Sequence, residues 1–135
     1  MLIESGEGTL DEEQCRALLA GGGTGRLGTT AGGLPVIVPV DFAVLGGDVV
    51  FRVAPSAAVR PMPVEAVVAF EVDARATDGT GDWSVLAIGR ARCVTDPAER
   101  AIADAGVPSC WAPAPGAHYV RIRTEVLTGR RIVTP

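Results

Sequence analysis

Few residues of this sequence could do acid–base chemistry, and two of them share a predicted strand. Glu71 and Asp73 lie two positions apart near a strand end, so their side chains point to the same face and could form a general acid–base pair. A solvated strand end is the more common reason for this spacing. His118 is the single histidine, and it is either a surface residue or a proton donor that lines a pocket.

The residue types of this sequence do not favour covalent catalysis or a metal site. All twelve basic residues are arginine, so no lysine amine is present to form a Schiff base, and no GxSxG nucleophile elbow occurs. Cys15, Cys93 and Cys110 are odd in number and far apart, which predicts neither a disulfide framework nor a zinc site. Each cysteine is interpreted as a small buried hydrophobe, with a reactive thiol as the alternative.

A glycine pattern near the N-terminus formally matches a nucleotide-binding fingerprint. Gly23, Gly25 and Gly28 satisfy GxGxxG, but that fingerprint requires a strand before it and a helix after it. Here a predicted helix precedes the glycines and a predicted strand follows them. We therefore interpret them as a helix end and a strand with close backbone approach.

Length, composition and net charge limit the number of domains and the classes of partner that the chain could have. With 135 residues, of which 47% are hydrophobic and 21% charged, the chain is predicted to form one domain over residues 1–135. A net charge of −4 without basic blocks argues against nucleic acid as a partner. No apolar run reaches the ~20 residues that cross a bilayer, and the acidic N-terminus is unlike a secretory signal, so we expect no membrane partner and a cytoplasmic location.

The segments that must position the candidate residues are mostly strands. Capping-box spacing of Thr9 and Glu12 predicts a helix near Leu10–Ala20, and Asp96 with Pro97 predicts a second helix that stops before Gly106. The predicted strands are Arg26–Thr30, Leu34–Val44, Asp48–Val53, Val67–Val72, Asp82–Val94, Tyr119–Thr124 and Arg130–Val133. Short connections between strands favour a mainly β (α+β) fold, an antiparallel barrel of six to seven strands with two short helices.

The order of short motifs along the chain resembles that of a known family. The motifs are Gly25-Arg26-Leu27, Leu34-Pro35-Val36, Pro39-Val40-Asp41-Phe42, Val50-Phe51-Arg52, Phe70-Glu71-Val72-Asp73, Trp83-Ser84-Val85, Gly89-Arg90-Ala91, Trp111-Ala112-Pro113 and Thr128-Gly129-Arg130-Arg131. Together they resemble the pyridoxamine 5′-phosphate oxidase-like, FMN-binding split-barrel family over nearly the whole chain.

The resemblance implies a homodimer of split barrels with two FMN clefts at the subunit interface. It implies that Val38, Pro39, Val40 and Asp41 run beside the flavin ring. Arg52, Ser56 and Arg60 would hold the phosphate, and Trp83, Ser84 and Trp111 would lie near the cleft. From the residues alone, the two tryptophans are equally well read as large pieces of a core or dimer seam.

Two positions depart from the family pattern. The family's phosphate segment continues to a glycine, a serine or threonine, and a lysine, whereas this chain reads Val53-Ala54-Pro55-Ser56-Ala57-Ala58. Loss of one charge-assisted contact weakens phosphate binding about tenfold to a hundredfold, unless Arg60 compensates. Asp41 also stands where relatives often carry asparagine, so an acceptor with negative charge replaces a donor amide.

The sequence therefore predicts a flavin-dependent oxidoreductase in which bound FMN exchanges a hydride with a small-molecule substrate. A deazaflavin is the alternative cofactor. The competing hypothesis is a non-catalytic dimer that binds a flavin or deazaflavin weakly, or no cofactor at all, since a fold alone does not establish a function.

Overall fold

The computed structural model describes residues 8–53, 65–75, 81–108 and 117–132. Four residues named in the sequence analysis lie outside these ranges. They are the predicted site residues Ser56, Arg60 and Trp111 and the cysteine Cys110. The elements, in chain order, are β1 (Thr9–Leu10), α1 (Glu12–Leu19), β2 (Gly23–Ala31), β3 (Leu34–Leu45), β4 (Asp48–Val53), β5 (Ala66–Ala74), β6 (Asp82–Cys93), α2 (Pro97–Gly106) and β7 (His118–Ile132).

Six strands close into an antiparallel barrel, in the order β2-β3-β4-β7-β6-β5 and back to β2. The short strand β1 pairs with the far end of β7 as an extra strand. The predicted antiparallel barrel of six to seven strands with two helices is confirmed for the described part of the chain. The predicted strands Val67–Val72 and Asp82–Val94 correspond to β5 and β6, which pair with each other in the barrel.

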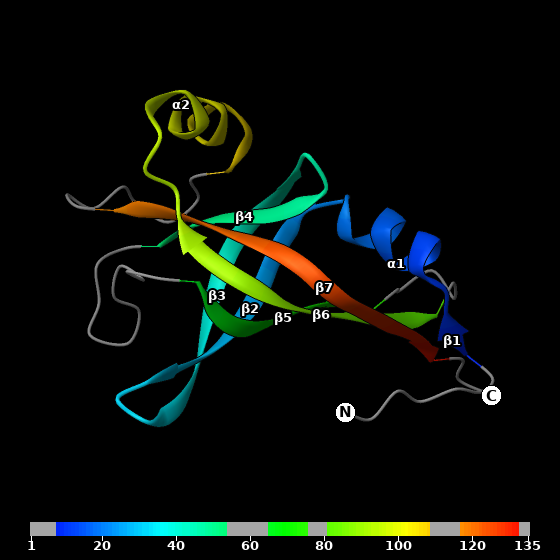
Figure 1. The fold of residues 1–135 in the computed structure, drawn as a ribbon. Helices are drawn as coiled ribbons and strands as arrows, with labels where there is room; N and C mark the ends of the chain where they lie inside the picture. Colours follow the sequence, from blue (N-terminus) through cyan, green and yellow to red (C-terminus); the bar gives the residue numbers. More distant parts are fainter. Residues whose placement is uncertain (1–7, 54–64, 76–80, 109–116, 133–135) are drawn as a thin grey trace.

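Two-glycine turns set the register of the first hairpins. Gly32 and Gly33 connect β2 to β3 with φ values of 57° and 80°, and Gly46 with Gly47 connects β3 to β4 in the same way. Left-handed φ values at both central positions suit the right-handed twist of the strands and are tolerated by glycine. The β2–β3 hairpin extends beyond the other strands (Figure 1).

The last strand differs from the sequence prediction. Instead of two strands, Tyr119–Thr124 and Arg130–Val133, one continuous strand β7 runs from His118 to Ile132. Its register against β6 shifts between Ile88 and Gly89, and the added residue bends β7 instead of ending it. Sequence periodicity is interrupted by such a bulge, which is why the pattern looked like two strands.

The barrel interior holds the main core. Phe42 and Phe70 meet edge to face with ring centroids 4.8 Å apart, and Phe51 lies over Phe70. The GxGxxG glycines lie in β2, where Gly25 faces the Phe70 ring so closely that a Cβ would collide with it. This confirms the interpretation as a strand with close backbone approach.

Helix α1 contributes Cys15 and Leu19 to this main core. Its N-cap is Asp11, paired in a capping box with Gln14, and not Thr9, which belongs to β1. The sequence offers two overlapping caps, and pairing of Thr9 with Arg130 draws the first one into the sheet. The buried state of Cys15 confirms its interpretation as a small hydrophobe.

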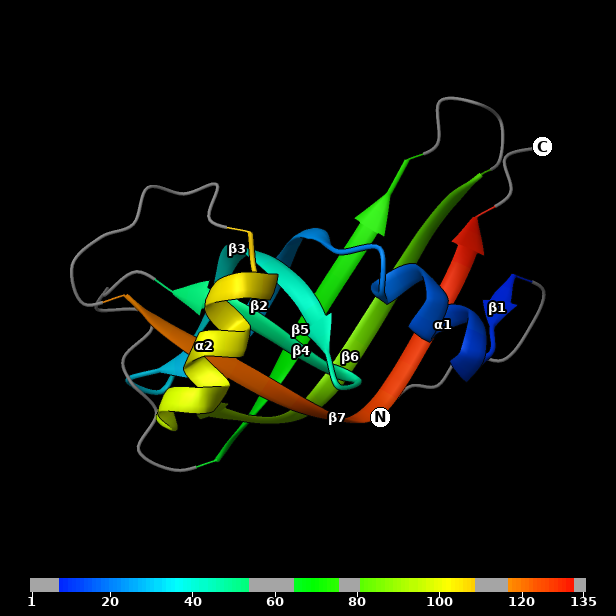
Figure 2. The ribbon, with the colours of Figure 1, turned by 90° about the horizontal axis from the view of Figure 1, so that it is seen from above.

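Helix α2 packs outside the barrel and has its own small core. Asp96 caps it and Pro97 opens it, as predicted. The buried residues of this second cluster are Val50, Val94, Ala103, Val107 and Tyr119. Figure 2 shows α2 lying across β4 and β7. Among the described residues, no helix has the length and apolarity needed to span a membrane.

Candidate functional site

Two residues predicted to bind the cofactor share one row across the outer face of the barrel. Asp41 is paired with Thr24 of β2, and Arg52 is paired with Tyr119 of β7. The β3–β4 ladder ends at Phe42 and Phe51, so Asp41 and Arg52 each lie one residue beyond that end. We call Thr24, Asp41, Arg52 and Tyr119 the outer row; their strand neighbours Val40, Phe42, Phe51 and Val120 face the main core.

Asp41 is a buried carboxylate with one unsatisfied oxygen. It is 7% exposed, and Thr24 Oγ1 donates a 2.9 Å hydrogen bond to its Oδ1. Its Oδ2 is buried, and none of the described residues donates a hydrogen bond to it. A buried acceptor without a donor is costly, so this atom calls for an N–H or O–H group from outside the described residues.

Arg52 is a half-buried cation at the end of β4. Among the described residues, its guanidinium makes neither a hydrogen bond nor an ion pair. The adjacent aromatic ring, Tyr119, is uncharged at neutral pH. Arg52 is therefore able to accept an anionic partner.

Tyr119 connects the outer row to helix α2. Its hydroxyl donates a 2.6 Å hydrogen bond to Asp104 Oδ1. Burial raises the pKa of Tyr119, the hydrogen bond and charge of Asp104 raise it further, and the positive charges of Arg52 and Arg100 oppose this rise. Two arginines, one from β4 and one from α2, therefore act on a single buried hydroxyl.

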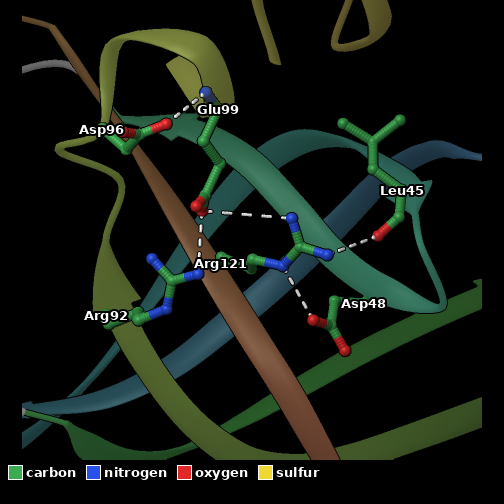
Figure 3. A network of polar contacts seen from close by, with 6 residues as sticks. All are labelled: Leu45, Asp48, Arg92, Asp96, Glu99 and Arg121. Carbon is green, nitrogen blue, oxygen red and sulfur yellow. Dashed lines mark hydrogen bonds and ion pairs between the residues drawn. The ribbon is translucent and has the colours of Figure 1, made fainter. Parts of the chain in front are cut away.

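The neighbouring Arg121, in contrast to Arg52, has hydrogen-bond and ion-pair partners among the described residues. Arg121 lies two positions beyond Tyr119 on the same face of β7 (Figure 3). Its Nε donates to Asp48 Oδ2 at 2.7 Å and its Nη2 to the Leu45 carbonyl at 3.0 Å. Glu99 of α2 lies 3.9 Å from Arg121 Nη1. This network fastens α2 and the β3–β4 turn to β7, so Arg121 has little capacity for a ligand.

The predicted acid–base pair lies beside the outer row. Arg26 Nη1 is 3.1 Å from Glu71 Oε1 and 3.5 Å from Asp73 Oδ2, so one guanidinium joins both carboxylates. Burial raises the pKa of Glu71, Asp73 raises it further, and Arg26 acts in the opposite direction. Burial and the neighbouring Asp73 thus favour the protonated form of Glu71, and Arg26 favours its carboxylate.

Strand β3 offers backbone groups next to Asp41. It pairs with β2 from Leu34 to Phe42, but its ladder with β4 covers only Phe42–Leu45. In the part of the chain that is described, the other edge of Val38–Asp41 therefore faces no strand. Pro39, which has no N–H to donate to a neighbouring strand, lies in this one-sided stretch.

The remaining predicted site residues divide between the two faces of the barrel. Val38, Val40 and Trp83 pack against the main core, whereas Ser84 follows Trp83 on β6 and points outward by strand alternation. His118 shares the inward direction of Val120 and so lies on the opposite face from Arg52 and Tyr119. Asp41 and Arg52 are the predicted residues that come together.

Sequence reasoning missed Thr24, Tyr119 and Arg100 as members of this region. Their proximity depends on strand pairing and on helix docking, neither of which periodicity reveals. One local signal was present. Arg100 and Asp104 have i,i+4 spacing, which puts both on one face of the predicted helix.

An open apolar hollow of about 350 Å³ lies on another part of the barrel surface. Its outward-facing members come from one row across four strands, in which Ile37, Gly28, Ala69 and Ile88 are successive pairing partners. Ile37 is 73% exposed and the nearby Val67 is 65% exposed. We call Ile37, Gly28, Ala69, Ile88 and Val67 the apolar row.

Comparison with known proteins identifies the family. A profile of the pyridoxamine 5′-phosphate oxidase family matches residues 11–131. The chain belongs to the pyridoxamine 5′-phosphate oxidase family. An uncharacterized protein of Mycobacterium tuberculosis is 34% identical over 129 residues, covering 92% of this chain and 84% of the relative.

Solved structures of two similar proteins share the fold. The FAD-binding protein of Mycobacterium smegmatis is 30% identical, with a TM-score of 0.76 over 94% of this chain and 99% of that one. A candidate pyridoxamine 5′-phosphate oxidase of Corynebacterium glutamicum is also 30% identical, with a TM-score of 0.80 over 93% of this chain and 98% of that one. The family resemblance read from the sequence motifs is thereby confirmed.

Proposed function

We propose that this protein is a flavin-dependent oxidoreductase that binds FMN along the outer row and exchanges a hydride with a small organic substrate. One observation carries the proposal. Asp41 and Arg52 occupy neighbouring positions of one row, the first with a buried acceptor that lacks a donor and the second without a carboxylate partner. Among the described residues, one anionic acceptor and one cation are thus left unmatched, each one position beyond the end of the β3–β4 ladder.

A flavin nucleotide carries one group that could bind the Arg52 guanidinium and another that could donate to Asp41 Oδ2. Arg52 would hold the phosphate, because guanidinium binds phosphate through charge-assisted hydrogen bonds. Asp41 Oδ2 would accept from a ring N–H or a ribityl hydroxyl. Backbone groups on the one-sided edge of Val38–Asp41 would bind the ring's polar atoms. A deazaflavin presents the same kinds of groups and is the alternative cofactor.

The bound flavin would supply the hydride-transfer chemistry, and the chain would supply binding, orientation and proton management. Glu71 is the residue best suited to hold a proton near the outer row, because burial and Asp73 both raise its pKa. Arg26 fixes this carboxylate pair in position. Glu71 would then donate its proton to a substrate atom as hydride transfer makes that atom basic.

Relatives support a flavin as the cofactor class. The M. smegmatis relative is a FAD-binding protein, and the C. glutamicum relative is a candidate pyridoxamine 5′-phosphate oxidase. The choice of FMN rests on the family resemblance and on the single guanidinium, Arg52, that the outer row offers to a phosphate.

A second copy of this chain is the proposed occupant of the apolar row. Ile37 and Val67 are exposed, Ala69 and Ile88 are half-buried, and the row crosses four paired strands. Exposed apolar patches of this kind mark interaction sites. The family resemblance implies a homodimer, and a twofold axis would bring one apolar row against another. Light scattering of the purified protein tests this, with Ile37→Asp expected to shift the mass from dimer to monomer.

The proposed function is tested by flavin titration. FMN added to the apoprotein is expected to bind in the micromolar range, followed by flavin fluorescence. Arg52→Ala should weaken this binding about tenfold to a hundredfold. Arg16→Ala is a matched control, because Arg16 pairs with Glu12 on helix α1 and its removal changes the net charge equally.

Turnover is tested separately, by reduction of the bound flavin with NADPH or NADH under anaerobic conditions. Reduction followed by reoxidation with an organic acceptor supports an oxidoreductase. Binding without reduction by either donor favours the non-catalytic alternative. Absence of binding by FMN and by a deazaflavin at high micromolar concentration overturns the proposal.

A further inference from the structure

Outside the outer row, one more arginine has no described partner on the same side of the barrel. Arg100 lies on α2, and its guanidinium, like that of Arg52, makes no hydrogen bond or ion pair with any described residue. By contrast, Arg16, Arg26, Arg90, Arg92, Arg121 and Arg123 each have a carboxylate neighbour. Two guanidinium groups without a partner among the described residues therefore belong to elements that touch at Tyr119.

The geometry brings these two arginines toward the same hydroxyl. Arg52 is directly opposite Tyr119 in the β4–β7 ladder, so their side chains are neighbours on one face. Arg100 is one helical turn before Asp104, whose Oδ1 accepts the 2.6 Å hydrogen bond of Tyr119. Both positive charges act on the phenol. The strand and the helix thus present two cations around one buried polar atom.

The nearby carboxylates do not neutralise this pair by direct contact. Asp104 accepts from the Tyr119 hydroxyl, and Asp41 accepts from Thr24 Oγ1. Neither lies within ion-pair distance of Arg52 or Arg100. Glu99, on the same helix, is held by Arg92 at 2.8 Å. The arrangement keeps two guanidinium groups available although acidic residues surround them.

We propose that Arg52 and Arg100 together form a phosphate subsite, with Arg100 of α2 supplying the second cation that the phosphate segment lacks. The ligand class is a phosphate monoester or a diphosphate, because two separate guanidinium forks suit an anion with several oxygens. The inference rests on the proposed function, since the anion is taken to be the tail of the flavin. It assigns a binding role to α2, which otherwise only covers the barrel.

The test compares Arg100→Gln with wild type and with Arg16→Gln, which removes the same charge from the exposed face of α1. Three flavins serve as probes: riboflavin, which lacks phosphate, FMN and FAD. Arg100→Gln is expected to weaken FMN and FAD binding about tenfold and to leave riboflavin within twofold. Arg16→Gln should change none of the three. An FMN affinity within twofold of wild type in Arg100→Gln overturns the subsite.

Inorganic pyrophosphate separates this inference from the proposed function. It should raise the melting temperature of wild type and of Arg16→Gln, because a ligand of the native state stabilises it, and should do so much less in Arg100→Gln. Pyrophosphate protection without flavin binding upholds the subsite while the flavin proposal fails. Flavin binding with pyrophosphate protection unchanged in Arg100→Gln upholds the flavin proposal while the subsite fails.

Discussion

Tyr119 and Asp104 are joined by a 2.6 Å hydrogen bond that connects strand β7 to helix α2. This bond is the polar contact at the centre of the small outer core, which also contains Val50 and Ala103. Within the described residues, Asp104 makes no ion pair with Arg100, which lies four residues earlier on the helix. One hydrogen bond therefore fixes both the helix position and the charge pattern beside Arg52.

Tyr119→Phe tests this dual role. The variant keeps the ring packing but leaves Asp104 without its donor, so the free energy of unfolding should fall by about 1–2 kcal/mol, measured by urea denaturation. Asp104 can then turn toward Arg100, because i,i+4 pairs of opposite charge attract. Pyrophosphate should accordingly protect this variant less than wild type. Unchanged stability and unchanged protection would together contradict the assignment.

The alkaline titration of Tyr119 gives a second prediction. Because the chain has one tyrosine, its ionisation is followed directly by ultraviolet difference absorbance. Arg100 opposes the rise in the pKa of Tyr119, so Arg100→Gln should move the titration to higher pH. Arg16→Gln should leave it unchanged.

The raised pKa of Tyr119 also predicts how the free energy of unfolding changes with pH. Burial is the main cause of the raised pKa of Tyr119 in the folded state. Its contribution to stability is therefore complete below the unfolded value of about 10 and is lost as pH rises through the folded value. Tyr119→Phe should lose less stability than wild type over this alkaline range. Parallel alkaline curves for the two proteins would show that Tyr119 is not the group responsible.

Local sequence signals were enough to predict most elements of the fold. Alternating apolar residues predicted Asp48–Val53 with its final bounds, and glycine pairs marked the turns at Gly32-Gly33 and Gly46-Gly47. Asp96 and Pro97 marked the start of α2. These features are local, because a turn or a cap depends on a few adjacent residues.

The site required information that is not local. Arg52 and Tyr119 are 67 positions apart in sequence and meet because β4 pairs with β7. Arg100 joins them because α2 docks on the outer face. The motif resemblance pointed to Asp41 and Arg52 as cofactor-binding residues, but it gave no reason to choose Tyr119 or Arg100. The register of long-range strand pairs and the packing of a helix are set by the whole core, so periodicity alone does not reveal them.

The bend in β6 and β7 depends on a glycine without a side chain. A Cβ at Gly89 would overlap the carbonyl of Arg123 and lie 3.0 Å from Thr124 Cα. Both contacts are backbone, so neither neighbour can move aside without distorting the ladder. We expect Gly89→Ala to lower the free energy of unfolding by about 3 kcal/mol or more.

Gly28→Ala is the matched control for this prediction, because it is also a glycine inside a strand. Its nearest neighbours to an added Cβ are at 3.6 and 3.7 Å, which is ordinary contact. Its stability should stay within about 1 kcal/mol of wild type. Thermal and urea unfolding of both variants provide the measurement, and equal stabilities would refute the role given to Gly89.

The charge of Asp41 should tune a flavin bound along the outer row. A buried carboxylate disfavours a second negative charge nearby, and reduction of a flavin at neutral pH adds negative charge to the ring. Asp41→Asn keeps the acceptor for Thr24 Oγ1 but removes the charge. The midpoint potential of the bound flavin should rise by about 30 mV, which is about 1.4 kcal/mol for a two-electron couple.

Asp73→Asn distinguishes this local effect from a general change in net charge. Asp73 also lies on the outer face and has the same charge, but it is exposed and shares Arg26 with Glu71. Solvent and the guanidinium both screen it, so its substitution should shift the potential much less. Redox titration against reference dyes measures both variants. Equal shifts in the two, or no shift in Asp41→Asn, would mean that the Asp41 carboxylate does not face the flavin ring, and the ring would then have to be sought elsewhere along β3.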